Sequence, residues 1–147
     1  MIEQGAAMFD TLVIGVGHNP DKGAGGMFSP DERVEMIAQT INEADIDNVI
    51  GIEVFSGYLG DFAREQEAGY ILRGVRNSPD FEYERVMRNL NGDMYPELQT
   101  VFMVPPRELA EVSSSVVKGL IGPKGWQRVV VPMVPPAVFT RLLADNG

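Results

Sequence analysis

The chain contains no cysteine and one histidine among its 147 residues. Without cysteine, it has neither a disulfide framework nor thiolate chemistry. A lone histidine also excludes most zinc sites, which combine several cysteine and histidine ligands. No apolar run approaches the roughly 20 residues of a membrane-spanning helix, and the first residues lack the basic segment that opens a secretory signal. We therefore expect a cytoplasmic protein with no metal site built from its own side chains.

Basic residues are also scarce: 12 lysines and arginines stand against 21 acidic residues, giving a net charge of −9. This balance disfavours nucleic acid and anionic membranes as partners, because both need a broad basic surface. It leaves room for a small anion held by a few gathered cations. The length favours one domain, residues 1–147, and the hydrophobic content of 44% is typical of a soluble globular protein.

Apolar runs alternate with helical patterns along the chain. We expect strands at residues 12–16, 49–55, 70–72 and 98–104. We expect helices at residues 29–43, 58–66, 80–91, 112–120 and 136–143, with the first eight residues read as a helix entered partway through and 129–131 as a short apolar run. The alternation predicts an α/β fold whose parallel sheet is covered by helices on both faces. Ser29, Pro30 and Glu32 form a capping-box signal for the first long helix.

The stretch from residue 70 to residue 84 carries the first candidate site. Arg73 and Arg76 follow a short buried strand, with Gly74 between them, and Asp80 has the character of a helix N-cap. Ligands of open α/β sheets bind beyond the carboxyl ends of the strands. Two guanidiniums at such an end predict an anion site, most naturally for phosphate. The alternative is a pair of surface arginines held by Glu82 and Glu84.

A second candidate lies at Ser113, Ser114 and Ser115, followed by Lys118. Serines at the start of a helix offer hydroxyls and free N–H groups to an anion. The alternative is an ordinary helix cap with a solvated lysine. The glycine-rich loop of residues 17–27 also holds a cation, Lys22, but it lacks the Gly-Lys-Ser/Thr ending of a Walker P-loop.

Several motifs occur in one fixed order along the chain. They are Asn19-Pro20-x-Lys22, Phe55-Ser56-Gly57, Arg73-Gly74-x-Arg76, Asp80-Phe81-Glu82-Tyr83-Glu84, Pro96-Glu97-Leu98 and Ser113-Ser114-Ser115-x-Val117-Lys118. In content and approximate spacing they resemble bacterial phosphopantetheine adenylyltransferases, and the resemblance covers nearly the whole chain. It implies a Rossmann-like nucleotidylyltransferase fold, usually assembled as a homohexamer.

The resemblance also implies an activity. The family transfers AMP from ATP to 4′-phosphopantetheine and releases dephospho-coenzyme A and pyrophosphate, with Mg²⁺ accompanying ATP. By resemblance, Lys22, Leu59 and Arg73 hold phosphopantetheine. The implied ATP-binding residues are Gly74, Val75, Arg76, Glu84, Leu109, Ala110, Glu111, Val112, Ser113, Ser114 and Ser115. Positioning and charge stabilisation dominate such transfer, so a site without an acid–base pair suits the chemistry.

The sequence departs from the family pattern at its N-terminus. The family's first strand, its Gly-Thr-Phe-Asp-Pro loop and its Asn-Gly-His motif are absent, so no catalytic residue is assigned. The family histidine would lie about three residues before Met1, roughly one helical turn. His18 is not expected to replace it. The absent strand is central in this fold, so we expect two exposed strand edges, low stability and little activity.

Two explanations for the absent N-terminal motifs remain open: a start codon placed too late, or a true truncation. Two functional alternatives also remain. One is a nucleotide-binding homologue without catalysis. The other is a nucleotidylyltransferase with a different acceptor, such as nicotinamide mononucleotide or a sugar-alcohol phosphate. There are also smaller departures from the family pattern, such as Asn91-Gly92-Asp93 in place of the family's Asn-Arg-His. That change removes a basic residue, so we expect it to alter the affinity for the substrates.

Overall fold

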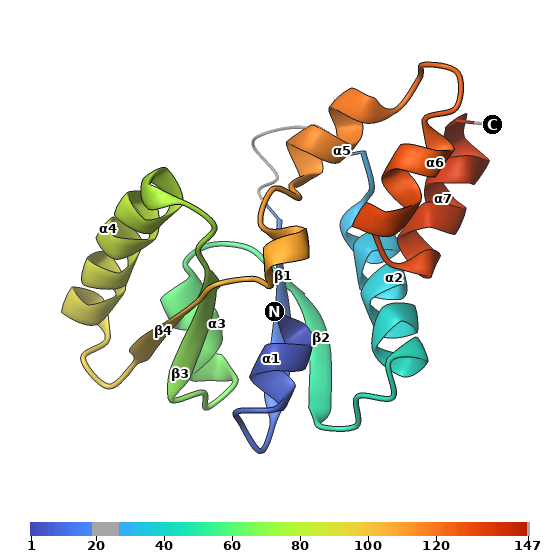
Figure 1. Ribbon diagram of the computed structural model, residues 1–147. Helices are drawn as coiled ribbons and strands as arrows, with labels where there is room; N and C mark the ends of the chain where they lie inside the picture. The colour runs from blue at the N-terminus through green and yellow to red at the C-terminus, as the bar shows by residue number, and fades with distance from the viewer. Residues whose placement is uncertain (19–26, 147) are drawn as a thin grey trace.

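A computed structural model describes residues 1–18 and 27–146. Helices and strands alternate through the first two-thirds of the chain, and helices fill the rest (Figure 1). The strands are β1 (Leu12–Gly17), β2 (Val49–Phe55), β3 (Tyr70–Gly74) and β4 (Gln99–Met103). The α-helices are α1 (Ile2–Ala6), α2 (Pro30–Glu43), α3 (Leu59–Glu65), α4 (Ser78–Met94), α5 (Ser114–Leu120), α6 (Gln127–Val130) and α7 (Pro136–Asn146). Two 3₁₀ turns, η2 (Arg107–Leu109) and η3 (Val131–Met133), complete the set. The predicted α/β class is confirmed.

The four strands form two separate parallel pairs. β1 pairs with β2, and β3 pairs with β4, with no ladder between β1 and β3 among the described residues. Two strands are fewer than an independently stable sheet needs. Helices that lie across both pairs therefore hold them together. The expectation of two strand edges without partners agrees with this topology.

Helices α1 and α3 connect the two strand pairs. A Cβ atom on Gly5 of α1 would lie 2.8 Å from a Leu72 methyl carbon in β3 and 3.3 Å from one of Leu12 in β1. On α3, Phe62 packs on Gly15 of β1, whereas Ala63 belongs to the buried cluster around Ile71 of β3. Each helix thus touches both pairs. Only glycine fits at Gly15, because a Cβ atom there would lie 2.8 Å from the Phe62 ring.

The C-terminal helices form a second core. Val117, Trp126, Val130 and Leu142 are buried together there, with Phe28 and Phe139 packed against them. The apolar run at residues 129–131 is helical, in α6 and η3, with Val130 fully buried beside Trp126 and its two valine neighbours exposed. α7 is tied to α2 by an ion pair between Arg141 and Glu32.

Helix starts follow local side-chain chemistry. The Ser29 capping box is present, with the Ser29 hydroxyl accepting from the Glu32 N–H at 3.2 Å. The prediction that Asp80 caps α4 is wrong. Asn77 is the N-cap and its side chain accepts from the Asp80 N–H at 2.9 Å, so α4 begins two residues earlier.

Within the part of the chain that the structure describes, no helix is both long and apolar enough to cross a membrane.

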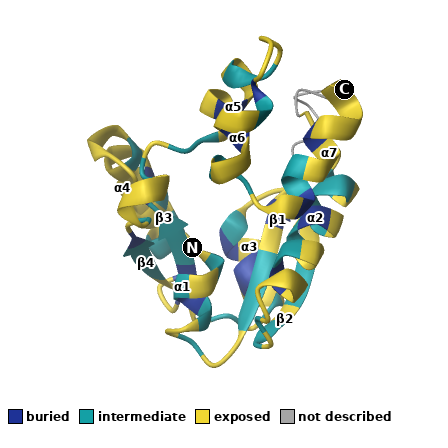
Figure 2. Ribbon diagram, turned by 45° about the vertical axis from the view of Figure 1, so that its right-hand side comes forward, coloured by how far each residue is buried: buried dark blue, intermediate teal, exposed yellow. Residues whose placement is uncertain are grey.

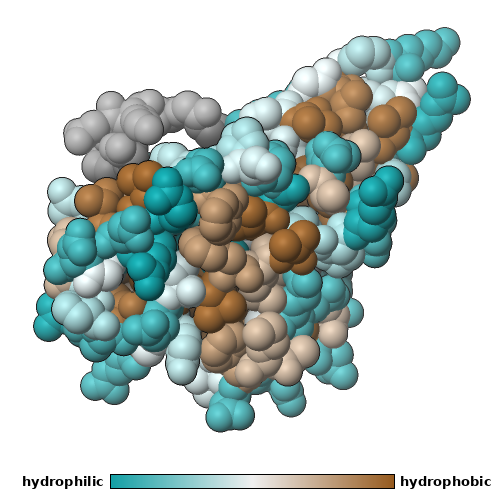
Figure 3. All heavy atoms as spheres, turned by 60° about the vertical axis from the view of Figure 1, so that its left-hand side comes forward, coloured by the Kyte–Doolittle hydropathy of each residue, from teal (hydrophilic) through white to brown (hydrophobic). Residues whose placement is uncertain are grey.

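Helix α4 is the most exposed of the long elements. Of its 17 residues only Glu84 is buried. Exposed residues run along this helix, whereas buried ones gather where α3 meets the strands (Figure 2). Several apolar side chains of this helix are exposed, among them Leu90 at 51%. Hydrophobic side chains also gather over the middle of the face drawn in Figure 3.

Candidate functional site

Arg73 and Glu84 form the centre of the candidate site. Arg73 lies one residue before the end of β3, and its Nε and Nη2 atoms each donate to a Glu84 carboxylate oxygen at 2.7 Å. This two-pronged geometry is the strongest arrangement of such a pair. Glu84 is 9% exposed, so most water is kept from its carboxylate. The bonded Glu84 raises the pKa of the Arg73 guanidinium, which stays charged.

Arg76 lies just beyond β3 and makes a second ion pair. Its Nε donates to the Asp80 carboxylate at 2.8 Å and its Nη2 at 3.3 Å. This hydrogen bonding lowers the pKa of Asp80 below its ordinary value and raises that of Arg76. The alternative view of this stretch was right for Glu84 and wrong for Glu82, which instead pairs with Arg85 at 2.8 Å.

Arg76 also brings the two candidate stretches together. Its Nη1 donates to the Val112 carbonyl at 3.2 Å, across 36 residues of sequence. Ser113 follows and caps α5, its hydroxyl accepting from the Val116 N–H at 3.2 Å. The capping alternative is therefore confirmed for Ser113. Ser114 and Ser115 are exposed and have no role in the cap.

Two hollows meet at the Arg73–Glu84 pair. The first, which we call the Leu59 hollow, measures about 320 Å³ and includes Leu59, His18 and Arg88 in its lining. The second, the arginine hollow, measures about 490 Å³ and includes Gly74, Arg76 and Asp80. Arg73 and Glu84 line both hollows. A charged pair in the shared wall can contact a ligand on either side.

The structure brings together some of the predicted residues and not others. Leu59, Arg73, Gly74, Arg76 and Glu84 line the two hollows. Val112 reaches them through its hydrogen bond with Arg76. The other predicted ATP-binding residues line neither hollow: they are Val75, Leu109, Ala110, Glu111, Ser113, Ser114 and Ser115. Lys22 lies outside the described residues.

Sequence reasoning missed part of the Leu59 hollow. Arg88 lines it, and so do Tyr83 and Asn91, all three from α4. Arg88 follows Glu84 by four residues, which places both on one side of a helix. That spacing was a usable signal. His18 also lines this hollow, with its backbone N–H donating to the Phe55 carbonyl at 2.8 Å. The expectation that His18 has no catalytic role stays a prediction.

The charges of the site are already paired in this structure. Arg73 and Arg76 each hold one carboxylate, so the two pairs are neutral as groups. The structure records no hydrogen bond from Arg73 Nη1 to another described residue, which leaves a donor for an anion. A phosphate can bind there directly or replace a carboxylate. No group of three or more metal-ligating side chains gathers among the described residues.

Comparisons with known protein sequences show the family of this chain. The model of the cytidylyltransferase-like family matches residues 1–120. The phosphopantetheine adenylyltransferase of Neisseria meningitidis serogroup C is 44% identical over 150 residues, covering 99% of this chain and 84% of the relative. The chain belongs to the phosphopantetheine adenylyltransferase family.

Other relatives extend the agreement across bacteria. The phosphopantetheine adenylyltransferase of Chromobacterium violaceum is 42% identical over 145 residues, covering 98% of this chain and 85% of the relative. That of Heliobacterium modesticaldum is 40% identical over 147 residues, covering 100% and 83%. The family resemblance drawn from the motifs is thus confirmed over the whole chain, and so is the nucleotidyltransferase class.

Proposed function

We propose that this member of the family transfers AMP from ATP to 4′-phosphopantetheine. A phosphate oxygen of the acceptor forms a bond to the α-phosphorus of ATP. The bond from that phosphorus to the bridging oxygen of the β-phosphate breaks, so pyrophosphate leaves and dephospho-coenzyme A forms. The observation that carries this proposal is the Arg73–Glu84 pair in a wall shared by two hollows. Two substrates that must meet at one phosphorus need two adjoining sites.

We assign the Leu59 hollow to the acceptor and the arginine hollow to ATP. Leu59 and Phe55 give the first hollow an apolar side for a pantetheine arm, and Arg73 provides a cation for its phosphate. Gly74 and Arg76 belong to the second hollow. The missing side chain at Gly74 allows a ligand to approach the backbone. Lys22 and the serines at 113–115 complete the proposed site through the family resemblance.

Charge stabilisation is the main contribution of these side chains. The pentavalent phosphorus and the leaving pyrophosphate carry negative charge, and fixed cations and N–H groups stabilise it. Arg73 is well suited because its partner holds the guanidinium in one orientation. We propose that Mg²⁺ enters bound to ATP, since protein sites for Mg²⁺ usually rely on substrate phosphates and few carboxylates.

One observation favours the alternative of a nucleotide-binding homologue without catalysis. No strand joins β1 to β3 among the described residues, and the hollows lie next to that gap. Because the sheet is interrupted beside the two hollows, the site positions its two substrates less precisely. Positioning errors of about 1 Å can lower the rate about a hundredfold. We therefore propose that the 147-residue chain binds both substrates and has little or no turnover.

Calorimetric titration together with pyrophosphate release tests the proposal. ATP and 4′-phosphopantetheine should each bind saturably, and pyrophosphate should appear only when both are present. Tight ATP binding without pyrophosphate release would support the binding homologue. Pyrophosphate release with nicotinamide mononucleotide, and none with phosphopantetheine, would support a different acceptor.

We also propose a cytoplasmic homohexamer, as the resemblance implies. The apolar side chains exposed on α4, such as Val86 and Leu90, offer surface for contacts between subunits. Sedimentation of the purified chain checks this: a hexamer is expected, and a monomer at all concentrations would contradict it.

A further inference from the structure

Tyr95 connects the end of α4 to the first turn of α3. It is the residue that follows α4, and it is 7% exposed. Its hydroxyl donates to the carboxylate of Asp61 in α3. We propose that Tyr95 is a positioning residue for the acceptor site: it fixes the first turn of α3, and with it Leu59, relative to the wall that α4 contributes to the Leu59 hollow. The identity of the acceptor in this statement rests on the proposed function.

The Tyr95 ring lies along one side of α3. A Cβ atom on Gly60 would overlap this ring, so the backbone of α3 comes as close to the ring as glycine allows. The guanidinium carbon of Arg64 lies 5.3 Å from the ring centroid, within the range of a cation–π contact. Gly60 and Arg64 are four residues apart and therefore share one side of the helix. Together with the bond to Asp61, Tyr95 contacts three of the seven residues of α3.

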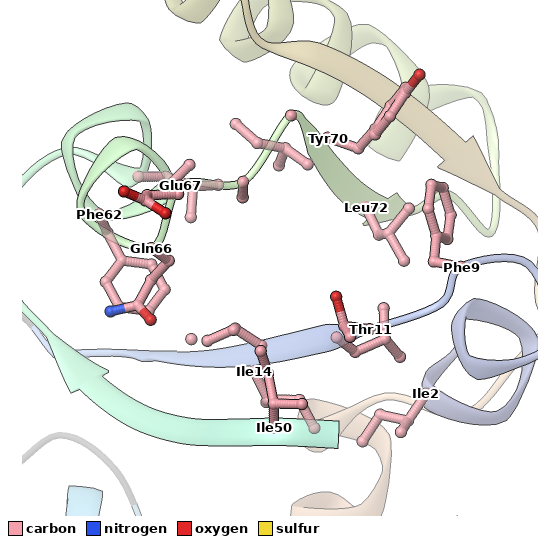
Figure 4. Close-up of a pocket in the computed structure, with 18 of the residues that line it drawn as sticks. Ile2, Phe9, Thr11, Ile14, Ile50, Phe62, Gln66, Glu67, Tyr70 and Leu72 are labelled. Atoms are coloured by element: carbon pink, nitrogen blue, oxygen red, sulfur yellow. The ribbon is translucent and has the colours of Figure 1, made fainter. Parts of the chain in front are cut away.

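The first turn of α3 depends on such packing for its position. Tyr58 is the N-cap residue, and within the described part of the chain its side chain makes no capping hydrogen bond. Helices of seven residues are marginal on their own. In Figure 4, Phe62 extends from α3 toward β1, and its ring stacks on Phe55 with 4.6 Å between the centroids. Phe62 thus holds α3 toward the strands, and Tyr95 holds it toward α4.

Leu59 and Asn91 connect these contacts to the Leu59 hollow. Both residues line the hollow, Leu59 from the first position of α3 and Asn91 from α4. Leu59 packs against the buried cluster that contains Tyr95, and the Tyr95 N–H donates to the Asn91 carbonyl at 2.7 Å. Tyr95 therefore sets the separation of two walls. A gap of about 0.5–1 Å already loses a quarter to a half of a van der Waals contact, so this separation affects how tightly an apolar arm binds.

The arginine hollow provides an internal comparison. Among the described residues that line it, none belongs to α3, and neither Tyr95 nor Asn91 is one of them. A shift of α3 should therefore alter the acceptor site and leave the proposed ATP site as it is. This difference separates a positioning role from a general loss of structure.

Calorimetric titration of the full 147-residue chain and its variants tests the proposal. Tyr95→Phe removes the hydroxyl and keeps the ring. We expect it to weaken binding of 4′-phosphopantetheine about fivefold, which corresponds to the net contribution of one ordinary hydrogen bond. The affinity for ATP should not change. Asp61→Ala should have the same effect on the acceptor, and its effect should not add to that of Tyr95→Phe in the double variant.

Two further variants make the result specific. Asp61→Asn keeps an oxygen that can accept from the Tyr95 hydroxyl, so it should retain the acceptor affinity that Asp61→Ala loses. Tyr70→Phe also removes a phenolic hydroxyl, but Tyr70 is 55% exposed and lines neither the Leu59 hollow nor the arginine hollow. Its hydroxyl points away from the pocket drawn in Figure 4. This variant should leave both affinities unchanged.

Amide hydrogen exchange measures the first turn of α3 without any ligand. The Phe62 N–H donates to the Tyr58 carbonyl in this turn, at 3.3 Å. Tyr95→Phe should speed the exchange of this amide about fivefold, again the effect of one hydrogen bond. The Val117 N–H, which donates to the Ser113 carbonyl in α5 at 2.9 Å, should exchange at an unchanged rate.

Three results would overturn the proposal. They are unchanged acceptor affinity in Tyr95→Phe, equal losses of affinity for the acceptor and for ATP, and unchanged exchange at Phe62. A native chain that binds no 4′-phosphopantetheine would overturn the proposed function and the acceptor named here. The exchange rate of Phe62 would then still decide whether Tyr95 positions α3, so the two failures are distinguishable.

Discussion

Arg73 and Glu84 join β3 to α4 through two parallel hydrogen bonds of 2.7 Å. The pair has two consequences. It anchors an otherwise exposed helix, since Glu84 is the only buried residue of α4. It also places a fixed, charged guanidinium between two hollows that the proposed reaction would fill with anions.

Glu84→Gln should lower the free energy of unfolding by about 1.5–3 kcal/mol, the usual contribution of a hydrogen bond to a charged group. The substitution keeps the shape of the side chain and leaves Arg73 without a charged partner. Glu82→Gln is the matched control on the same helix, because its pair with Arg85 is at least half exposed. Urea unfolding of both variants checks this. Equal effects at the two positions would show that the buried pair does not anchor α4.

Arg73→Lys should weaken binding of ATP and of 4′-phosphopantetheine at least tenfold while the protein remains folded. Lysine keeps the charge but cannot hold Glu84 and a phosphate in one plane. Isothermal titration calorimetry measures both affinities. Arg85→Lys, which changes a similar cation on the exposed side of α4, should leave them unchanged. Unaltered affinities in the Arg73 variant would remove it from the substrate site.

Ser113→Ala and Ser115→Ala separate capping from ligand binding. Ser113 caps α5, so its loss should lower the free energy of unfolding by about 1 kcal/mol. Ser115 is exposed and should change stability by less than about 0.5 kcal/mol. By the proposed function, Ser115→Ala should still weaken ATP binding in a calorimetric titration. A loss of stability at Ser115 equal to that at Ser113 would contradict the capping assignment.

Gly60→Ala should be destabilising by about 1–3 kcal/mol, the usual effect of overfilling a packed site. A Cβ atom on Gly60 would overlap the ring of Tyr95. The Tyr95 hydroxyl donates to Asp61, and the Arg64 guanidinium carbon lies 5.3 Å from the centroid of the Tyr95 ring. Gly92→Ala in α4 is the control, since nothing lies within 4 Å of its Cβ position. It should stabilise by about 0.5–1 kcal/mol. Thermal unfolding compares the two, and a stabilised Gly60 variant would show that Tyr95 is free to move.

The Arg76–Asp80 pair should make stability depend on pH in the acid range. Its hydrogen bonds lower the pKa of Asp80 in the folded protein, whereas the unfolded value is about 3.9. The pair's contribution is therefore fully present above about pH 4 and is lost as pH falls through the lower, folded pKa. The stability difference between the native chain and Asp80→Asn should shrink over this range in urea unfolding. A constant difference down to pH 2.5 would contradict the shifted pKa.

Much of the fold could be predicted because its signals are local. Ser29, Pro30 and Glu32 lie next to one another in sequence and form the predicted capping box. β-Branched runs marked the strands to within about two residues. Local signals were misleading at the start of α4, where two residues, Asn77 and Asp80, can both act as a helix N-cap. Asn77 rather than Asp80 caps α4, because Arg76 holds the Asp80 carboxylate.

The site was harder to predict because its contacts are distant in sequence. The hydrogen bond from Arg76 to Val112 crosses 36 residues, and no pattern within either stretch encodes it. The choice between Glu82 and Glu84 as the partner of Arg73 depends on which side of α4 faces β3. The position of Arg88 in the Leu59 hollow follows from the same helix orientation. The family resemblance supplied the chemistry, and only the three-dimensional structure showed two hollows sharing one ion pair.

Product analysis tests the central claim most directly. The purified chain is incubated with ATP, Mg²⁺ and one acceptor at a time: 4′-phosphopantetheine, nicotinamide mononucleotide or a sugar-alcohol phosphate. Mass spectrometry then identifies the adenylylated product. We expect dephospho-coenzyme A with the first acceptor, no product with the other two, and a lower yield from Arg73→Lys. Adenylylation of a different acceptor, or no product from any of the three, would contradict the proposed function.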